Sequence, residues 1–162
     1  MSSSRNKTVS SPSGLPSSLE DHLGYWLRYV SNHVSAAFAR RLEGYNITVS
    51  EWVALRQLYD ADLCSPGELG LRMGMTKGAV SRLIERLQGK GLLTRSASAK
   101  DGRAQVLRIA AAGKQLVPQL ARLADENDRA FFSVLPQPAQ EQLLRAMRLL
   151  VEHHKLKQLP TD

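Results

Sequence analysis

The fold of this chain is decided by residues 65–89, which read SPGELGLRMGMTKGAVSRLIERLQG. Ser65, followed by a proline and by Glu68, is typical of a helix N-terminus, because the serine oxygen and the glutamate side chain can each bond a free backbone N–H group. Gly74 then interrupts the pattern, and Thr76 is a second N-cap residue. Two short helices joined by a glycine turn predict a helix-turn-helix.

The second helix of this stretch has two different faces. Its apolar residues recur at helical spacing and therefore form one stripe that can pack into a core. The opposite face carries small and basic residues, which a DNA-reading helix presents to base edges and phosphates. A solvated face with a tolerated glycine is the ordinary alternative. The apolar stripe consists of Val80, Leu83, Ile84 and Leu87, and the opposite face of Lys77, Gly78, Ser81, Arg82 and Glu85.

Most of the net charge of the chain lies in this part of the sequence. The whole chain has a formal net charge of +7. Between Thr76 and Arg108 there are eight basic residues and two acidic ones. Basic residues clustered in one structural segment favour contact with a polyanion such as DNA over an evenly charged surface.

A hairpin is predicted after the second helix. Residues 92–95 and 105–109 are typical of two strands, and an Asp-Gly pair between them favours a tight turn. A basic hairpin that follows a recognition helix is typical of the wing of a winged helix. We expect Arg103 to enter a narrow minor groove, Lys100 to contact phosphate, and Asp101 to pair with an arginine and hold the wing in shape.

Further helices are predicted on both sides of this lobe, after a serine-rich tail over residues 1–18 that is expected to be disordered. The fold class is therefore mainly α with a small β-hairpin wing, in one domain over residues 19–162. The expected helices run from residue 19, capped by Ser18, to about 43, where Gly44 ends the helix; from Thr48, in a capping box with Glu51, to about Asp60; from 111 to about 134; and from the break at Pro136 and Pro138 to about 158.

These motifs resemble the MarR family of bacterial regulators over about residues 19–157. The most specific parts are Ser-Pro-Gly-Glu-Leu-Gly from Ser65, Thr-Lys-Gly-Ala-Val-Ser-Arg from Thr76, the wing around Asp101 and the closing Gly113. The chain departs from the family pattern at Ile109-Ala110, where a Leu-Thr pair is usual and the threonine would cap the next helix.

The resemblance implies a homodimer, in which residues 19–45 and 111–158 form dimerisation helices and residues 46–110 form the DNA-binding lobe. Two recognition helices would then bind the half-sites of a pseudo-palindromic operator in double-stranded DNA. Helices that fold back on their own subunit are the alternative. The predicted DNA-contacting residues are Ser65, Thr76, Lys77, Gly78, Ser81, Arg82, Arg86, Lys100 and Arg103.

An effector site is predicted where the resemblance implies a cleft between the dimerisation helices and the lobe. A row of aromatic side chains in the first helix and two residues of the second helix would border it. Rings can stack on a planar molecule while histidine and arginine bind a carboxylate or phenolate, so we expect a small aromatic or heteroaromatic acid. Packing in a core is the alternative for each ring. These residues are His22, Trp26, Tyr29, His33, Trp52 and Arg56.

Several other classes of protein are disfavoured. The sequence has no apolar run long enough for a membrane span and no signal peptide, so a cytoplasmic, nucleoid-associated protein is expected. No catalytic motif is present, and no cofactor or metal ion is expected, although Cys64 as a redox switch and the tail at His153 and His154 stay open. The predicted function is repression of a catabolic or resistance operon, and the alternative is a ligand-blind architectural DNA-binding protein.

Overall fold

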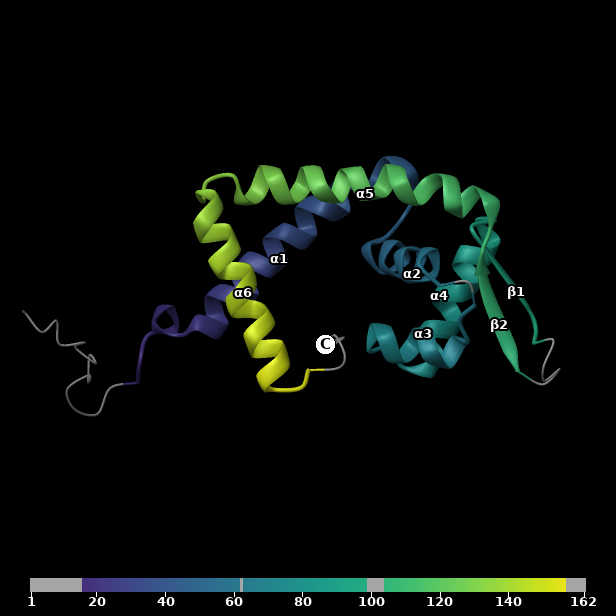
Figure 1. Cartoon of the computed structure of the whole chain (residues 1–162), viewed down its shortest axis with the longest axis horizontal. Coiled ribbons are helices and arrows are strands. Elements are labelled where there is room, and N and C mark those ends of the chain that lie inside the picture. Colours follow the sequence, from purple (N-terminus) through teal and green to yellow (C-terminus); the bar gives the residue numbers. More distant parts are fainter. Residues whose placement is uncertain (1–15, 62, 99–103, 157–162) are drawn as a thin grey trace, which may run out of the picture. The chain divides into compact units, whose positions relative to one another are not determined.

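The computed structural model describes residues 16–61, 63–98 and 104–156, which form two compact units. The first unit is Met1–His33 and the second is Val34–Asp162, so the division falls within one helix. In chain order the elements are a 3₁₀ turn Leu19–Asp21, α1 Leu23–Leu42, a 3₁₀ turn Glu43–Tyr45, α2 Val49–Tyr59, α3 Pro66–Met73, α4 Lys77–Gly89, β1 Leu93–Ala97, β2 Gln105–Ile109, α5 Ala111–Phe132 and α6 Gln137–His153 (Figure 1).

The first unit begins differently from the predicted single helix over residues 19–43. Ser18 caps a 3₁₀ turn in a capping box with Asp21, and His22 is extended with φ −97° and ψ 120°. The Trp26 indole N–H donates to the Glu20 carbonyl at 2.9 Å. In a continuous helix that carbonyl would accept the amide of Gly24, so the helix restarts at Leu23 and His22 lies outside it.

The end of α1 also differs from the prediction that Gly44 ends the helix. The chain passes through the turn Glu43–Tyr45, and the left-handed residue is Asn46, with φ 53° and ψ 41°. The Asn46 amide donates to the Glu43 carbonyl at 3.0 Å. Asparagine tolerates this conformation better than most other non-glycine residues, so Asn46 is the left-handed residue at the end of the helix, where Gly44 was expected.

The helix-turn-helix forms as predicted, and the fold class is confirmed. Thr48 caps α2 in a capping box with Glu51, and Ser65 caps α3 in a second one with Glu68. Gly74 follows α3 with φ 63°, the left-handed conformation that a glycine adopts without steric cost. The two helices cross closely, because a Cβ on Gly70 would lie 3.1 Å from Val80 Cγ2.

The core of the second unit lies between α2, α3, α4, the hairpin and the first half of α5. All four residues of the predicted apolar stripe of α4 are buried in it. Fully burying one leucine contributes about 2 kcal/mol, so these contacts fix the orientation of α4 about its axis. The fully buried apolar side chains include Leu42, Leu55, Leu69, Leu83, Leu107 and Leu120.

The predicted hairpin is an antiparallel pair in which Leu93 faces Ile109. The inner strand β2 also bonds to the loop before α3, since the Leu107 amide donates to the Cys64 carbonyl at 2.8 Å. This bridge ties the wing to the helix-turn-helix. The tip of the wing, with Lys100, Asp101 and Arg103, lies outside the described residues.

Helix α5 starts directly after the hairpin (Figure 1). Ala110 is its N-cap and makes no side-chain cap bond, in accord with the missing threonine. The Ala110 amide instead donates to the Leu92 carbonyl at 3.0 Å. Gly113 faces the same carbonyl so closely that a Cβ there would lie 2.4 Å from it. Pro118 lies within the helix, which continues to Phe132.

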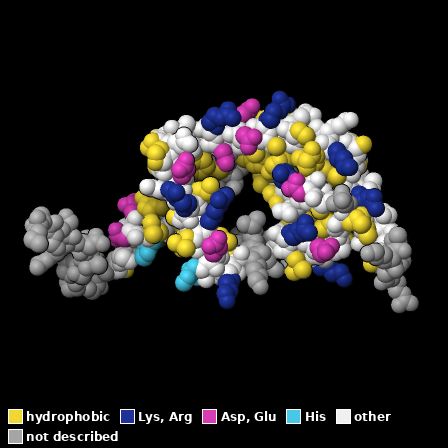
Figure 2. All heavy atoms as spheres, viewed as in Figure 1, with side chains coloured by type: hydrophobic (Ala, Val, Ile, Leu, Met, Phe, Trp, Pro, Cys, Tyr) yellow, Lys and Arg dark blue, Asp and Glu magenta, His cyan; other side chains and the backbone are white. Residues whose placement is uncertain are grey.

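Helix α6 follows the break at Pro136 and ends at His153, before the predicted end near residue 158. None of its residues is buried in this chain. Figure 2 shows hydrophobic side chains at the surface around it. Its exposed apolar residues include Leu143, Leu144, Met147, Leu150 and Val151. Within the described residues, no helix is long and apolar enough to cross a membrane.

Candidate nucleic-acid interface

Several of the residues predicted to contact DNA lie at the start and in the N-terminal half of α4. The Thr76 hydroxyl accepts the Ala79 amide at 3.3 Å and starts the helix there. Lys77, Gly78 and Arg82 are exposed, and Ser81 is half-buried. Because the apolar stripe of α4 is locked into the core, this face must point outward.

The surface at Gly78 is open. No atom lies within 4 Å of a Cβ built on this glycine, so the fold itself does not require a glycine here. The first turn of a helix also offers unpaired N–H groups and the positive end of the helix dipole. A bare backbone beside Lys77 at such a turn can approach a phosphate group closely.

A hollow of about 400 Å³ is lined by residues from this face of α4 and from the hairpin. Arg95 of β1 borders the hollow together with Lys77 and Ser81. The Arg95 guanidinium donates from Nε to Gln105 Oε1 at 3.0 Å, which orients it across the hairpin. Arg95 was not among the predicted contacts, although it belongs to the basic segment and could have been found from its place in the first strand.

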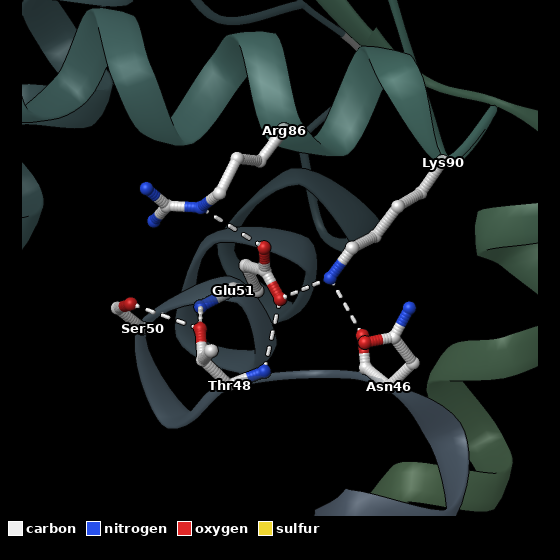
Figure 3. A network of polar contacts seen from close by, with 6 residues as sticks. All are labelled: Asn46, Thr48, Ser50, Glu51, Arg86 and Lys90. Atoms are coloured by element: carbon white, nitrogen blue, oxygen red, sulfur yellow. Dashed lines mark hydrogen bonds and ion pairs between the residues drawn. The ribbon is translucent and has the colours of Figure 1, made fainter.

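Arg86 is held by a buried carboxylate (Figure 3). Its Nε donates to Glu51 Oε1 at 3.2 Å, and Lys90 Nζ donates to Glu51 Oε2 at 2.8 Å. The Thr48 amide donates to the same Oε2 at 2.9 Å. Glu51, at the first turn of α2, therefore joins its own N-cap to two cations of α4. The sequence predicted Glu51 only as a capping residue.

Hydrogen bonds decide the ionisation of Glu51. Burial by itself would raise the pKa of this carboxyl, but the hydrogen bonds from Lys90, the Thr48 amide and Arg86, with the charge of Lys90, lower the pKa below its ordinary value of 4.5. Glu51 is therefore ionised at neutral pH. A buried carboxylate with this set of donors is stable only while they remain in place.

Comparisons with known proteins agree with this architecture. Residues 45–104 match the family model described as MarR family. An HTH-type transcriptional repressor of Mycobacterium tuberculosis is 26% identical over 128 residues, which cover 79% of this chain and 92% of the repressor. A crystal structure of a probable transcriptional regulator from Pseudomonas aeruginosa has a TM-score of 0.75 and 29% identity over 82% of this chain and 99% of that one.

Together these findings support a transcriptional regulator of the MarR family. The chain is a DNA-binding regulator and not an enzyme. A structure of Bordetella bronchiseptica BpsR, whose title concerns regulation of DNA binding by 6-hydroxynicotinic acid, has a TM-score of 0.76 at 22% identity, over 83% of this chain and 96% of BpsR. At that identity the likeness shows the fold.

Two of the predicted DNA contacts in this chain are cap residues. The Ser65 hydroxyl accepts the Glu68 amide at 3.2 Å, and the Ser65 amide donates to Glu68 Oε2 at 2.7 Å. These bonds to Ser65 also lower the pKa of Glu68. In the same way, the Thr76 oxygen accepts a backbone amide of α4. Each hydroxyl keeps its own proton for donation, so contact with a phosphate stays a prediction for both.

The predicted effector residues of the first unit form an aromatic cluster without His22. Trp26 and Tyr29 are 46% and 49% exposed, and their ring centroids are 6.1 Å apart. The His33 ring stacks on Tyr29 at 4.4 Å, and its Nδ1 lies 2.8 Å from the Tyr29 carbonyl oxygen. Tyr25, which was not predicted, meets Trp26 edge-on at 5.3 Å. His22 instead lies 3.0 Å from the Ser17 hydroxyl.

The predicted effector residues of α2 have partners within the second unit. Trp52 packs edge-on against Phe38, with ring centroids 6.2 Å apart. Arg56 pairs with Asp60 and lies over the Tyr59 ring, with its guanidinium carbon 5.8 Å from the centroid. The hydrogen bond that Arg56 donates to Asp60 raises the pKa of Arg56. Any effector that binds Arg56 must compete with Asp60.

The described residues do not favour the other sensing chemistries. Cys64 is buried, and this burial raises the pKa of its thiol above the ordinary value. A buried, protonated thiol reacts slowly with oxidants. Within residues 16–61, 63–98 and 104–156, no group of three or more His, Cys, Asp or Glu side chains could hold a metal ion.

Proposed function

We propose that this MarR protein is a homodimeric repressor of a catabolic or resistance operon, acting in the cytoplasm on the nucleoid. It would bind a pseudo-palindromic operator through α4 and the wing, and a small aromatic or heteroaromatic acid would release it. The observation that carries the proposal is the N-terminal half of α4, which is open and basic while its other face is buried.

The contacts divide by chemistry. Lys77 at the start of α4 suits a phosphate, whereas Arg82 and Ser81, in the second turn, suit base edges in the major groove. Gly78 lets the backbone approach between them. Changing Arg82 to alanine should therefore relax base preference, while changing Lys77 should weaken binding to all sequences alike. Lys100 and Arg103 of the wing are proposed for the neighbouring phosphate and minor groove.

Exposed apolar surface supports the homodimer. Leu150 of α6 is 48% exposed, and Leu23, Leu27 and Val30 on α1 are exposed as well. Apolar rows at helical spacing that no part of the same chain buries are typical of helices that pack on a partner. A symmetric dimer would place two α4 helices on one face, which two half-sites about one DNA turn apart require.

The exposed aromatic cluster supports an aromatic effector. Trp26 and Tyr29 present ring surface, and the His33 ring stacks on Tyr29. Exposed rings of this kind can bind planar acids by stacking. Regulation of the structural relative BpsR by 6-hydroxynicotinic acid points to the same chemical class. An acid that binds one arrangement of the dimer better would shift it from the DNA-competent state.

Fluorescence polarisation tests the proposal directly. The protein is titrated into duplex DNA taken from upstream of its own gene and into a scrambled duplex of equal length, with and without benzoate, nicotinate and 6-hydroxynicotinate. Selective binding that one acid reverses is the expected result. Equal affinity for both duplexes would refute operator recognition. A monomer molar mass for the free protein, measured by light scattering, would refute the homodimer.

A ligand-blind architectural DNA-binding protein is the second candidate. It is favoured by the internal partners of Trp52 and Arg56, which leave these side chains with a packing role and an ion pair. The two functions differ in one measurement. An architectural protein would bind DNA with an affinity that no aromatic acid changes, and Trp26→Ala would then leave DNA binding as it is at every acid concentration.

A further inference from the structure

The buried carboxylate of Glu51 has one negative charge and two cationic partners. Its side chain is 0% exposed, while those of Arg86 and Lys90 are 50% and 26% exposed. Lys90 Nζ also donates to the Asn46 carbonyl at 2.6 Å. The ammonium of Lys90 thus lies between a carboxylate and a carbonyl oxygen, and the end of α4 is fastened to the start of α2.

We infer that Glu51 is a positioning residue that fixes the recognition helix and withdraws Arg86 and Lys90 from DNA phosphates, so that it sets the preference for operator over unrelated DNA. The inference rests on the proposed DNA-reading role of α4. It also changes the prediction for Arg86, which becomes a residue that acts through Glu51 and not a primary contact.

The spacing of the basic residues along α4 supports this assignment. Arg82, Arg86 and Lys90 follow one another at intervals of four residues, and each interval turns the side chain by about 40° around the helix axis. The row therefore moves from the outward face toward α2. Arg82 is exposed and faces outward, Arg86 reaches Glu51 through one nitrogen, and Lys90 is the most buried of the three.

The charges explain why such a device affects selectivity. Binding to unrelated DNA depends on phosphate contacts, and each contact adds about 0.9 to the slope of log affinity against log salt. Cations that Glu51 neutralises contribute little to that slope. Selective binding depends in addition on a fixed orientation of the reading helix, because base edges must meet donors at defined positions. Glu51 thus lowers the first kind of binding and supports the second.

Glu51→Gln separates these effects. Glutamine has the same shape and can still accept the Thr48 amide, but it cannot neutralise Arg86 and Lys90. On a scrambled 30-bp duplex we expect affinity to rise about tenfold near 0.1 M salt, and the salt slope to steepen by about 0.9 to 1.8. A purely structural role predicts the opposite, a loss of affinity for all DNA, and that outcome or an unchanged slope would overturn the inference.

The matched control is Glu126→Gln, which makes the same change in net charge on α5. Glu126 pairs with Arg41 at 3.8 Å, and both side chains are exposed. This variant should leave the salt slope and the preference between duplexes as in the unmodified protein. If it raises affinity for scrambled DNA as much as Glu51→Gln does, net charge alone is responsible and the inference is wrong.

A second pair of variants decides the question even if Glu51→Gln does not fold. Lys77→Gln and Lys90→Gln remove the same charge from the two ends of α4. We expect the first to lower the salt slope by about 0.9 and the second to change it by less than about 0.3. An equal decrease would place Lys90 on a phosphate and overturn the inference. The scrambled duplex suffices for this test, so a missing operator preference would refute the proposed function separately.

Discussion

The winged-helix lobe and α6 differ in the burial of their apolar residues. In the lobe, the apolar stripe of α4 is buried, and Leu55, Leu69 and Leu107 are fully enclosed. In α6, an equally regular stripe from Leu143 to Val151 stays at the surface. Both patterns have the helical period, so amphipathicity alone does not say which helix finds its partner within the same chain.

This difference separates two kinds of stability. The lobe has its own core and satisfied caps, so its fold follows from one chain. The apolar side of α6 gains little from its own chain, and we expect its stability to come from a second copy. A change in the lobe should therefore alter unfolding, whereas a change in α6 should alter association.

The largest expected effect tests how tightly the lobe is packed. In Gly113→Ala, the new Cβ would lie 2.4 Å from the Leu92 carbonyl oxygen and 2.7 Å from Ile109 Cγ1, so backbone must move. We expect the free energy of unfolding to fall by about 3 kcal/mol in urea titrations. Gly89→Ala is the control, because nothing lies within 4 Å of its Cβ. A loss under about 1 kcal/mol would mean that this junction is loose.

The next effect tests whether a partner covers α6. Leu150→Glu places a charge on the apolar stripe, and we expect the dimer dissociation constant to rise at least about 100-fold, or about 2.7 kcal/mol. Sedimentation across a concentration series measures it. Leu149→Glu is the control, because Leu149 is 66% exposed and points away from the stripe. Equal weakening by both variants would show that the stripe is not the interface.

A third prediction separates binding from folding within the lobe. Gly78→Ala meets no atom of the protein, and alanine favours a helix by up to about 1 kcal/mol over glycine. We expect unchanged or higher stability together with about tenfold weaker operator binding, measured by polarisation. Gly89→Ala, at the other end of α4, should leave binding unchanged. If Gly78→Ala bound the operator as tightly as the unmodified protein, close approach of the backbone to DNA at Gly78 would be refuted.

The pH dependence of the lobe gives a smaller effect. Because the pKa of Glu51 is lowered on folding, its contribution to stability is complete above its ordinary value of 4.5 and is lost as the pH falls through the lower folded value. Urea midpoints between pH 6 and pH 3 should therefore fall less steeply in Glu51→Gln than in the unmodified protein. Parallel curves would mean that Glu51 is not stabilised by Arg86 and Lys90.

The smallest expected effect concerns the lobe's only thiol. Because Cys64 is buried and the pKa of its thiol is raised, micromolar peroxide should leave DNA affinity unchanged within error. Polarisation before and after treatment checks this, with Cys64→Ala as the reference for oxidation elsewhere. If peroxide weakened DNA binding by the unmodified protein but not by Cys64→Ala, the interior of the lobe would be open to oxidants.

Most of the helix boundaries could be predicted from local sequence motifs. Caps at Thr48, Ser65 and Thr76 involve residues at most three apart, so their spacing alone identifies them. The break at His22 was not predictable in this way, because it depends on a bond from the Trp26 indole to a carbonyl six residues earlier. Asn46 was missed because Gly44 is the stronger statistical signal for a left-handed residue.

The polar network at Glu51 shows the limit of sequence reasoning for the site. Glu51 and Arg86 are 35 residues apart, and Glu51 already has a sufficient local role as a cap. Nothing in the spacing indicates that both of its carboxylate oxygens also accept hydrogen bonds from Arg86 and Lys90. For the aromatic row, the sequence identified Trp26, Tyr29 and His33 as neighbours, but it did not indicate that His22 leaves the helix or that Tyr25 joins the rings.

The direct passage from β2 into α5 has a mechanical consequence. One residue, Ala110, separates the strand from the helix, and its amide is bonded to Leu92 on the other side of the hairpin. The 22 residues of α5 extend about 33 Å, so a tilt of about 5° at one end displaces the other end by about 3 Å. Because only Ala110 separates β2 from α5, we expect a tilt of α5 to move the hairpin with it.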